Sequence, residues 1–199
     1  MSRFPIHTID TAPVESKGRL KDLEQAVGMI PNLAAGMAES PALLSAFLAV
    51  REIYHRGTLS PAEAQVISLT AAYENECAWC MAFHSFAAGN EGVSPDDVHA
   101  LRTGRSPSEP RFGALSDFAR AMLQRRGAIG GDQLRRFLDA GYTRQQALEV
   151  VMGLAFSLMA NYAGHLVNPP LDQPLQPYEW RAPVMFSDHT PATLIDVTT

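Results

Sequence analysis

Long apolar runs and clusters of basic residues are both missing from this sequence of 199 residues. The longest apolar runs, such as 153–160, are far too short to span a bilayer, and no apolar core follows Arg3 as it would in a secretory signal. The 16 Lys and Arg residues are scattered and the formal net charge is −5, which argues against a surface for nucleic acid. We therefore expect a cytoplasmic protein with neither a membrane nor a nucleic acid among its partners.

Cysteine is also scarce, because Cys77 and Cys80 are the only two in the chain. Two cysteines cannot form the disulfide framework of a small secreted protein. A disulfide that closes so short a loop also constrains little of the unfolded chain, so it would add little stability. The spacing of three residues points instead to redox chemistry or to metal binding.

The sequence lacks alternating apolar and polar residues over any stretch long enough for a typical β-strand. Apolar side chains recur at helical spacing instead, and capping signals mark several helix starts. Ser60 with Glu63, and Thr143 with Gln146, have the spacing of capping boxes. These patterns predict an all-α fold of about eight helices. We expect a helical domain over 18–170, an N-terminal arm over 1–17 and a C-terminal arm over 171–199.

Prolines and isolated apolar side chains characterise the predicted C-terminal arm. Trp180, Met185 and Phe186 lie in it without helical spacing. The arm is not expected to form a helix that could bury these side chains within one chain. We therefore expect the arm to lie across a neighbouring copy. The chain is thus predicted to form a homo-oligomer, at least a dimer.

The chemistry-bearing motif is Cys77-Ala78-Trp79-Cys80-Met81-Ala82-Phe83-His84. On a helix, residues separated by three and seven positions share one face, so both sulfurs and the imidazole would lie together. If Asn75 caps this helix, both thiols sit near its N-terminus, where the helix dipole favours a thiolate. A neighbouring histidine can accept the thiol proton, and the second thiol can resolve an oxidised sulfur into a disulfide.

Two less reactive interpretations of the motif stay open. Both cysteines can be small buried apolar residues with His84 as a core histidine, since free cysteines are often buried. A zinc site is the other interpretation, but no second C-x-x-C or H-x-x-x-H supplies the remaining ligands. His165, on an apolar helix, is also expected to be a core histidine. We expect neither a metal nor a cofactor.

The stretch from Gln65 to His84 resembles the alkylhydroperoxidase D (AhpD)-like branch of the carboxymuconolactone decarboxylase superfamily. The similarity extends over about residues 18–170, through segments such as 28–33 and 140–143. The resemblance implies an all-helical, homo-oligomeric protein with thiol peroxidase or disulfide reductase activity. Its partners would be a hydroperoxide substrate and a thiol or dithiol reductant.

The resemblance also implies a role for each residue of the motif. Cys80 would be the peroxidatic cysteine, Cys77 the resolving one, and His84 part of a proton relay with a glutamate twelve residues before the first cysteine. Gln65 occupies that position here, and an amide cannot accept a proton. Glu63 and Glu74 are nearby alternatives for the missing carboxylate.

Gln65 can reach His84 if its helix folds back beside the helix of the cysteines. We then expect weak peroxidase activity, because the amide can only orient the imidazole. A redox-responsive or structural oligomer without peroxidase activity is the main alternative. The superfamily also contains lactone decarboxylases, but these generally lack the cysteine pair.

Overall fold

The computed structural model describes residues 2–183, and within this range it contains nine α-helices, one 3-10 helix and no β-strand. The predicted all-α class is confirmed. The helix that the sequence pattern did not separate is α2, which has six residues, five of them buried, and therefore shows no amphipathic spacing. The elements are α1 (Val14–Val27), α2 (Asn32–Met37), α3 (Pro41–Tyr54), α4 (Pro61–Glu74), α5 (Ala78–Asn90), α6 (Pro95–Arg102), α7 (Pro110–Gln124), α8 (Gly131–Asp139), α9 (Arg144–Val167) and the 3-10 helix η1 (Gln173–Tyr178).

Both predicted capping boxes are formed. The Ser60 amide donates to Glu63 Oε2 at 2.8 Å, and the Glu63 amide donates to Ser60 Oγ at 3.2 Å. Thr143 and Gln146 make the same pair of bonds at the start of α9. Each box satisfies backbone donors that a helix start leaves without partners, so the sequence fixes where α4 and α9 begin.

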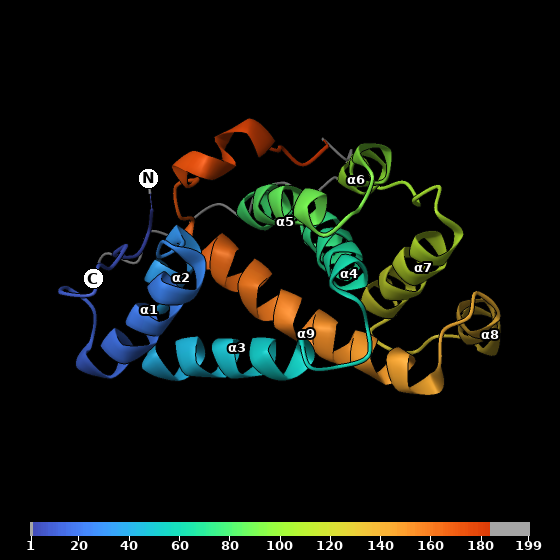
Figure 1. Ribbon diagram of the computed structural model, residues 1–199, viewed down its shortest axis with the longest axis horizontal. Coiled ribbons are helices and arrows are strands. Elements are labelled where there is room, and N and C mark those ends of the chain that lie inside the picture. Colours follow the sequence, from blue (N-terminus) through green and yellow to red (C-terminus); the bar gives the residue numbers. More distant parts are fainter. Residues whose placement is uncertain (1, 184–199) are drawn as a thin grey trace, which may run out of the picture.

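Helices α4 and α9 form the centre of the molecule. Figure 1 shows α9 crossing the fold obliquely, with α4 and α5 on one side of it and α3 on the other. The middle of α4 is buried all round, including Val66, Ile67 and Leu69. Burying such side chains contributes roughly 1.5–3 kcal/mol each. This burial makes α4 a firm support for the side chains that it turns toward α5.

Helix α9 extends over 24 residues and is apolar along most of its length. Its 24 residues are long and apolar enough to cross a membrane, by length and composition alone. However, 56% of its most apolar stretch is buried within the fold. Helix α9 therefore has the character of a core helix that keeps one exposed apolar side.

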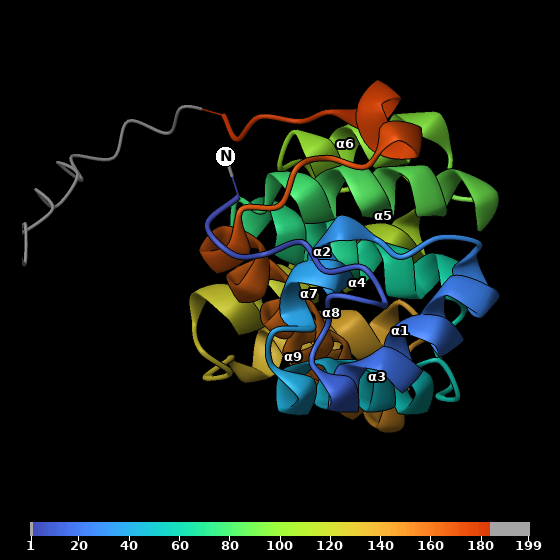
Figure 2. The ribbon, with the colours of Figure 1, turned by 90° about the vertical axis from the view of Figure 1, so that its left-hand side faces the viewer.

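The two predicted arms differ from expectation where the structure describes them. Helix α1 begins at Val14, before the predicted boundary at residue 18. The C-terminal segment contains η1, which lies over α5 (Figure 2). Trp180 is buried in its own chain, where its indole Nε1 donates to the Arg102 carbonyl at 2.9 Å. The expectation that one chain cannot accommodate Trp180 is wrong, and Met185 and Phe186 lie outside the described residues.

Candidate active site

The cysteine motif lies where α4 turns sharply into α5. Asn75 ends α4, Glu76 takes the left-handed conformation with φ of 53°, and Cys77 is the N-cap of α5. The Cys80 amide donates to Cys77 Sγ at 3.3 Å. The predicted capping role of Asn75 is therefore wrong. The cysteine itself occupies the cap, so its sulfur lies closer to the helix amides than the sequence analysis assumed.

Cys77 and Cys80 are joined by a disulfide, with their Cα atoms 5.3 Å apart. Both are almost fully buried, at 2% and 1% exposure. Helix α9 passes directly over the pair at Gly164, where an ideal Cβ would lie 2.9 Å from Cys77 Sγ. Only a residue without a side chain fits at this distance, so Gly164 allows α9 to close the sulfurs off.

His84 and Gln65 come together from α5 and α4. His84 Nδ1 lies 2.8 Å from Gln65 Oε1, and both side chains are buried. Because the amide oxygen can only accept, Nδ1 carries the proton in this bond. The other ring nitrogen, Nε2, is then the unprotonated one and can accept a proton.

The electrostatic surroundings keep His84 neutral. Burial, with a smaller contribution from the positive charges of His55 and Arg51, lowers the pKa of His84 from 6.5 to about 3. Neither alternative glutamate is bonded to it. Glu63 pairs with Arg111 at 2.8 Å, and Glu74 pairs with Arg120 at 2.8 Å. Gln65 is therefore the hydrogen-bond partner that orients the imidazole.

The two sulfur atoms belong to residues that line different cavities. Cys80 and His84 line an apolar cavity of about 70 Å³ between α1, α2, α3, α5 and α9. Cys77 lines a wider cavity of about 350 Å³, together with Glu76 and His165. Trp79 lines both cavities. A molecule could thus approach one cysteine without passing the other.

Some contacts around the site were missed by the sequence analysis. Asp172, buried in the predicted C-terminal arm, accepts from Trp79 Nε1 at 2.9 Å and from the Asn32 amide at 3.0 Å. His165 is exposed rather than in the core, and its Nε2 lies 2.5 Å from the Asn75 carbonyl. These contacts join residues that are 90 to 140 positions apart in the sequence, so local spacing could not predict them. Asp172 carried only the sequence signal of one acidic residue within a proline-rich stretch.

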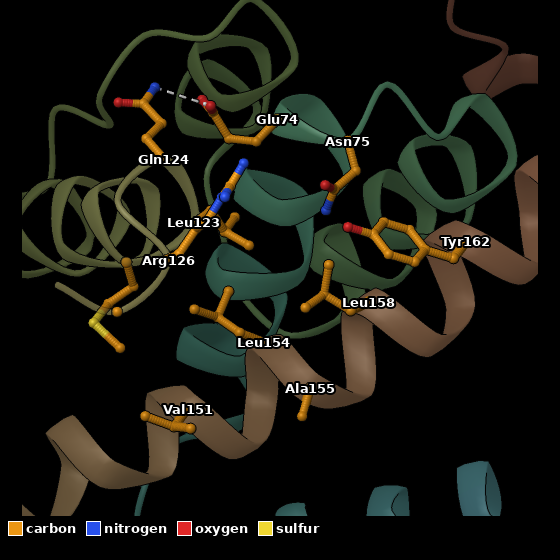
Figure 3. Close-up of a pocket in the computed structure, with 12 residues that line it drawn as sticks. Glu74, Asn75, Leu123, Gln124, Arg126, Val151, Leu154, Ala155, Leu158 and Tyr162 are labelled. Carbon is orange, nitrogen blue, oxygen red and sulfur yellow. Dashed lines mark hydrogen bonds between the residues drawn. The ribbon is translucent and has the colours of Figure 1, made fainter.

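A larger groove lies on another side of α9 (Figure 3). Its volume is about 520 Å³, and Val151, Ala155, Leu158 and Tyr162 of α9 line it. None of the described residues that line this groove is a cysteine or a histidine, so it is separate from the candidate chemistry. Within residues 2–183, no three His, Cys, Asp or Glu side chains are close enough together to hold a metal ion.

The fold and the site define an all-helical protein that holds a C-x-x-C disulfide at a helix N-terminus beside a histidine. Residues 41–121 match the sequence model of the Carboxymuconolactone decarboxylase family. This match runs from α3 into α7 and includes both cysteines, His84 and Gln65. The matched segment is thus similar to the carboxymuconolactone decarboxylase family, and the fold is AhpD-like, in agreement with the resemblance seen in the sequence.

Solved structures agree with this fold. An alkylhydroperoxidase AhpD core protein of Ralstonia eutropha JMP134, described as an uncharacterized peroxidase-related protein, superposes with a TM-score of 0.79 at 19% identity, over 87% of this chain and 94% of that one. An uncharacterized peroxidase-related protein of Silicibacter sp. TM1040 superposes with a TM-score of 0.73 at 19% identity, and the match covers 87% of this chain and 92% of that protein. A cysteine-to-alanine variant of the debrominase Bmp8, in complex with 2,3,4-tribromopyrrole, superposes with a TM-score of 0.72 at 16% identity. The match covers 89% of this chain and 97% of that protein. No curated protein sequence matches the chain significantly.

Proposed function

We propose that the protein is a thiol-dependent peroxidase that reduces organic hydroperoxides with Cys80, Cys77 and His84. The observation that carries the proposal is the shared apolar cavity of Cys80 and His84, beside a disulfide at a helix N-terminus. An apolar cavity suits the organic part of a hydroperoxide, and the neutral imidazole can accept the thiol proton. The AhpD core protein among the similar structures supports the same chemistry.

The reaction begins once a dithiol has reduced the Cys77–Cys80 disulfide. His84 Nε2 accepts the proton of Cys80, and the resulting thiolate attacks the outer oxygen of the hydroperoxide. The O–O bond breaks, Cys80 becomes a sulfenic acid, and the alkoxide takes a proton to leave as an alcohol. The Cys77 thiol then attacks the sulfenic sulfur, which restores the disulfide and releases water.

The second cavity suits the return of electrons. A reductant thiolate that approaches through the 350 Å³ cavity meets Cys77 first. Attack there forms a mixed disulfide and releases Cys80 as a thiol, and the second thiol of the reductant then displaces Cys77. Peroxide and reductant would in this way use separate cavities, so one need not leave before the other enters.

Steady-state turnover of cumene hydroperoxide with excess dithiothreitol tests the proposal. We expect measurable consumption by the native chain and a loss to the uncatalysed rate for Cys80→Ser and for His84→Ala. His99→Ala is a matched control, because this residue lies on α6 and lines neither cavity. Equal rates for the native chain and Cys80→Ser would overturn the proposal.

Reductive debromination is a second candidate. The cavity beside Cys80 is walled by two stacked aromatic pairs, Trp79 with Phe83 and Phe47 with Phe156, which suit a flat aromatic substrate. In such a reaction a C–Br bond is replaced by C–H, while the dithiol becomes a disulfide and bromide and a proton are released. Bromide release from 2,3,4-tribromopyrrole by the reduced protein would favour this candidate over the peroxidase.

Two remaining alternatives are separated by their dependence on thiols. A lactone decarboxylase neither consumes a dithiol nor forms a disulfide, so its turnover would be insensitive to dithiothreitol. A redox-responsive oligomer would form the disulfide under oxidant but would not turn over any of these substrates.

A further inference from the structure

Among the residues that the structure describes, one charged residue lines the cavity beside Cys80 and His84. Its other lining side chains are apolar apart from the two site residues, and they come from α1, α2 with its N-cap Pro31, α3, α5 and α9. Arg51, on the last turn of α3, is the exception. Because Arg51 is also exposed, the residue lies between this apolar cavity and solvent.

Arg51 has no ion pair or side-chain hydrogen bond with any residue in the described range 2–183. Glu52, the adjacent acidic residue, is paired with Arg56 instead. The charge of Arg51 nevertheless acts on the site, because it contributes to the lowered pKa of His84. An arginine near a helix C-terminus stabilises the helix through its dipole, but this interaction does not require the side chain to line a cavity.

We propose that this cavity selects hydroperoxides that carry an anionic head group, with Arg51 binding a carboxylate while the apolar part of the substrate lies against the aromatic walls. This inference rests on the proposed peroxidase function. A guanidinium binds a carboxylate through two parallel hydrogen bonds, and its aliphatic stem packs on apolar surface. A volume of about 70 Å³ holds only a few carbon atoms, so the substrate class is a short-chain hydroperoxy acid.

The kinetic test compares a hydroperoxyhexanoic acid with its methyl ester, which differ only in the charge and size of the head group. We expect the native chain to prefer the acid by about tenfold in kcat/KM, because a charge-assisted hydrogen bond typically contributes at least that much. Arg51→Gln should remove the preference, mainly through KM, while Arg51→Lys should keep part of it. Arg56→Gln is the matched control and should leave the preference intact, since Arg56 does not line the cavity.

The acid-to-ester ratio isolates the head group from other effects of Arg51. Removal of its charge also changes the surroundings of His84, but this affects both substrates alike and cancels in the ratio. Equal rates for acid and ester in the native chain would overturn the inference while the peroxidase function stands. A loss in Arg51→Gln that is the same for acid and ester would overturn it as well.

A binding measurement tests the inference without turnover. In a Trp180→Phe background, Trp79 is the remaining tryptophan, and it lines the cavity. Hexanoate should change its fluorescence, with a Kd about tenfold weaker in Arg51→Gln, whereas hexanol should bind both forms equally. Failure to reduce any hydroperoxide, together with Arg51-dependent binding of hexanoate, would remove the peroxidase function and leave the anion site. Hexanoate binding that is unaffected by Arg51→Gln would overturn the site.

Discussion

At the scale of single residues, the pair of His84 and Gln65 decides how well the site can move protons. The imidazole is buried, neutral and held by an amide oxygen 2.8 Å from Nδ1. A carboxylate at this position would favour the protonated ring, whereas the amide only orients it. With its pKa lowered to about 3, His84 is a weak base toward a thiol. We therefore propose that peroxide turnover by the native chain is slow.

Gln65→Glu should speed the reaction. A buried carboxylate beside Nδ1 raises the pKa of His84 and stabilises the imidazolium that forms when Cys80 loses its proton. We expect a gain of about 10- to 100-fold in hydroperoxide turnover, within the range of general acid–base catalysis. The gain should disappear in the double variant that also carries His84→Ala. No gain in Gln65→Glu, with His84→Ala still inactive, would mean that another group supplies the charge.

His84 also makes stability depend on pH. Its pKa is 6.5 when unfolded and about 3 when folded, so between these values the unfolded chain binds the proton more readily. The stability that neutral His84 contributes is therefore complete above its unfolded pKa and is lost as the pH falls toward 3. At about pH 4.5 the loss should be roughly 2–3 kcal/mol.

Urea unfolding of the oxidised protein near pH 7.5 and near pH 4.5 measures this loss. His84→Gln, which does not titrate, should show a pH dependence smaller by that amount. An unchanged pH dependence in His84→Gln would mean that the other buried groups cause the acid sensitivity.

At the scale of elements, local signals located the helices, and long-range packing decided the details of the site. The boxes at Ser60 and Thr143 marked two helix starts, because a capping box is a contact within four residues. The turn before α5 was harder to predict. Asn75 does not cap the helix but donates to Asn161, which is 86 residues away in the sequence. The contact between Gln65 and His84 could be predicted, because a tight turn between two helices brings them side by side. The role of Gly164 could not be inferred, because it depends on how α9 crosses α5.

Gly164→Ala tests this crossing. The new methyl group would lie 2.9 Å from Cys77 Sγ, so α9 or the disulfide must shift. Overpacking of this kind typically costs about 1–3 kcal/mol, measured as the free energy of unfolding in urea. Gly89→Ala, on the exposed side of α5 with nothing within 4 Å of the new methyl group, should instead stabilise by about 0.5–1 kcal/mol. Equal effects of the two substitutions would contradict the close contact.

At the scale of the whole molecule, α9 has an apolar stripe that no other part of residues 2–183 covers. Leu148, Val151, Tyr162 and Leu166 are 73%, 47%, 63% and 58% exposed, and Ala155 between them is exposed too. Residues 150–167 include no Asp, Glu, Lys or Arg. The spacing of three and four residues is that of a helix–helix seam, and part of the stripe borders the groove in Figure 3. We propose that the stripe of a second copy covers it.

Val151→Lys should weaken the assembly, since it puts a charge in the middle of the proposed seam. Light scattering at micromolar concentration should show at least a dimer for the native chain and a smaller species for the variant. Ile53→Lys is the matched control, because Ile53 is equally apolar and 58% exposed but lies on α3. A native chain that is monomeric under these conditions would rule the assembly out.

The central claim is that reduction of a hydroperoxide and formation of the Cys77–Cys80 disulfide are one reaction. A single-turnover experiment tests it most directly: fully reduced protein receives one equivalent of cumene hydroperoxide, and intact-mass spectrometry and alcohol product are followed together. We expect the chain to lose two hydrogen atoms as one equivalent of alcohol appears, and we expect neither change in Cys80→Ser. Alcohol formation without the disulfide, or a chain that keeps both thiols while the hydroperoxide persists, would contradict it.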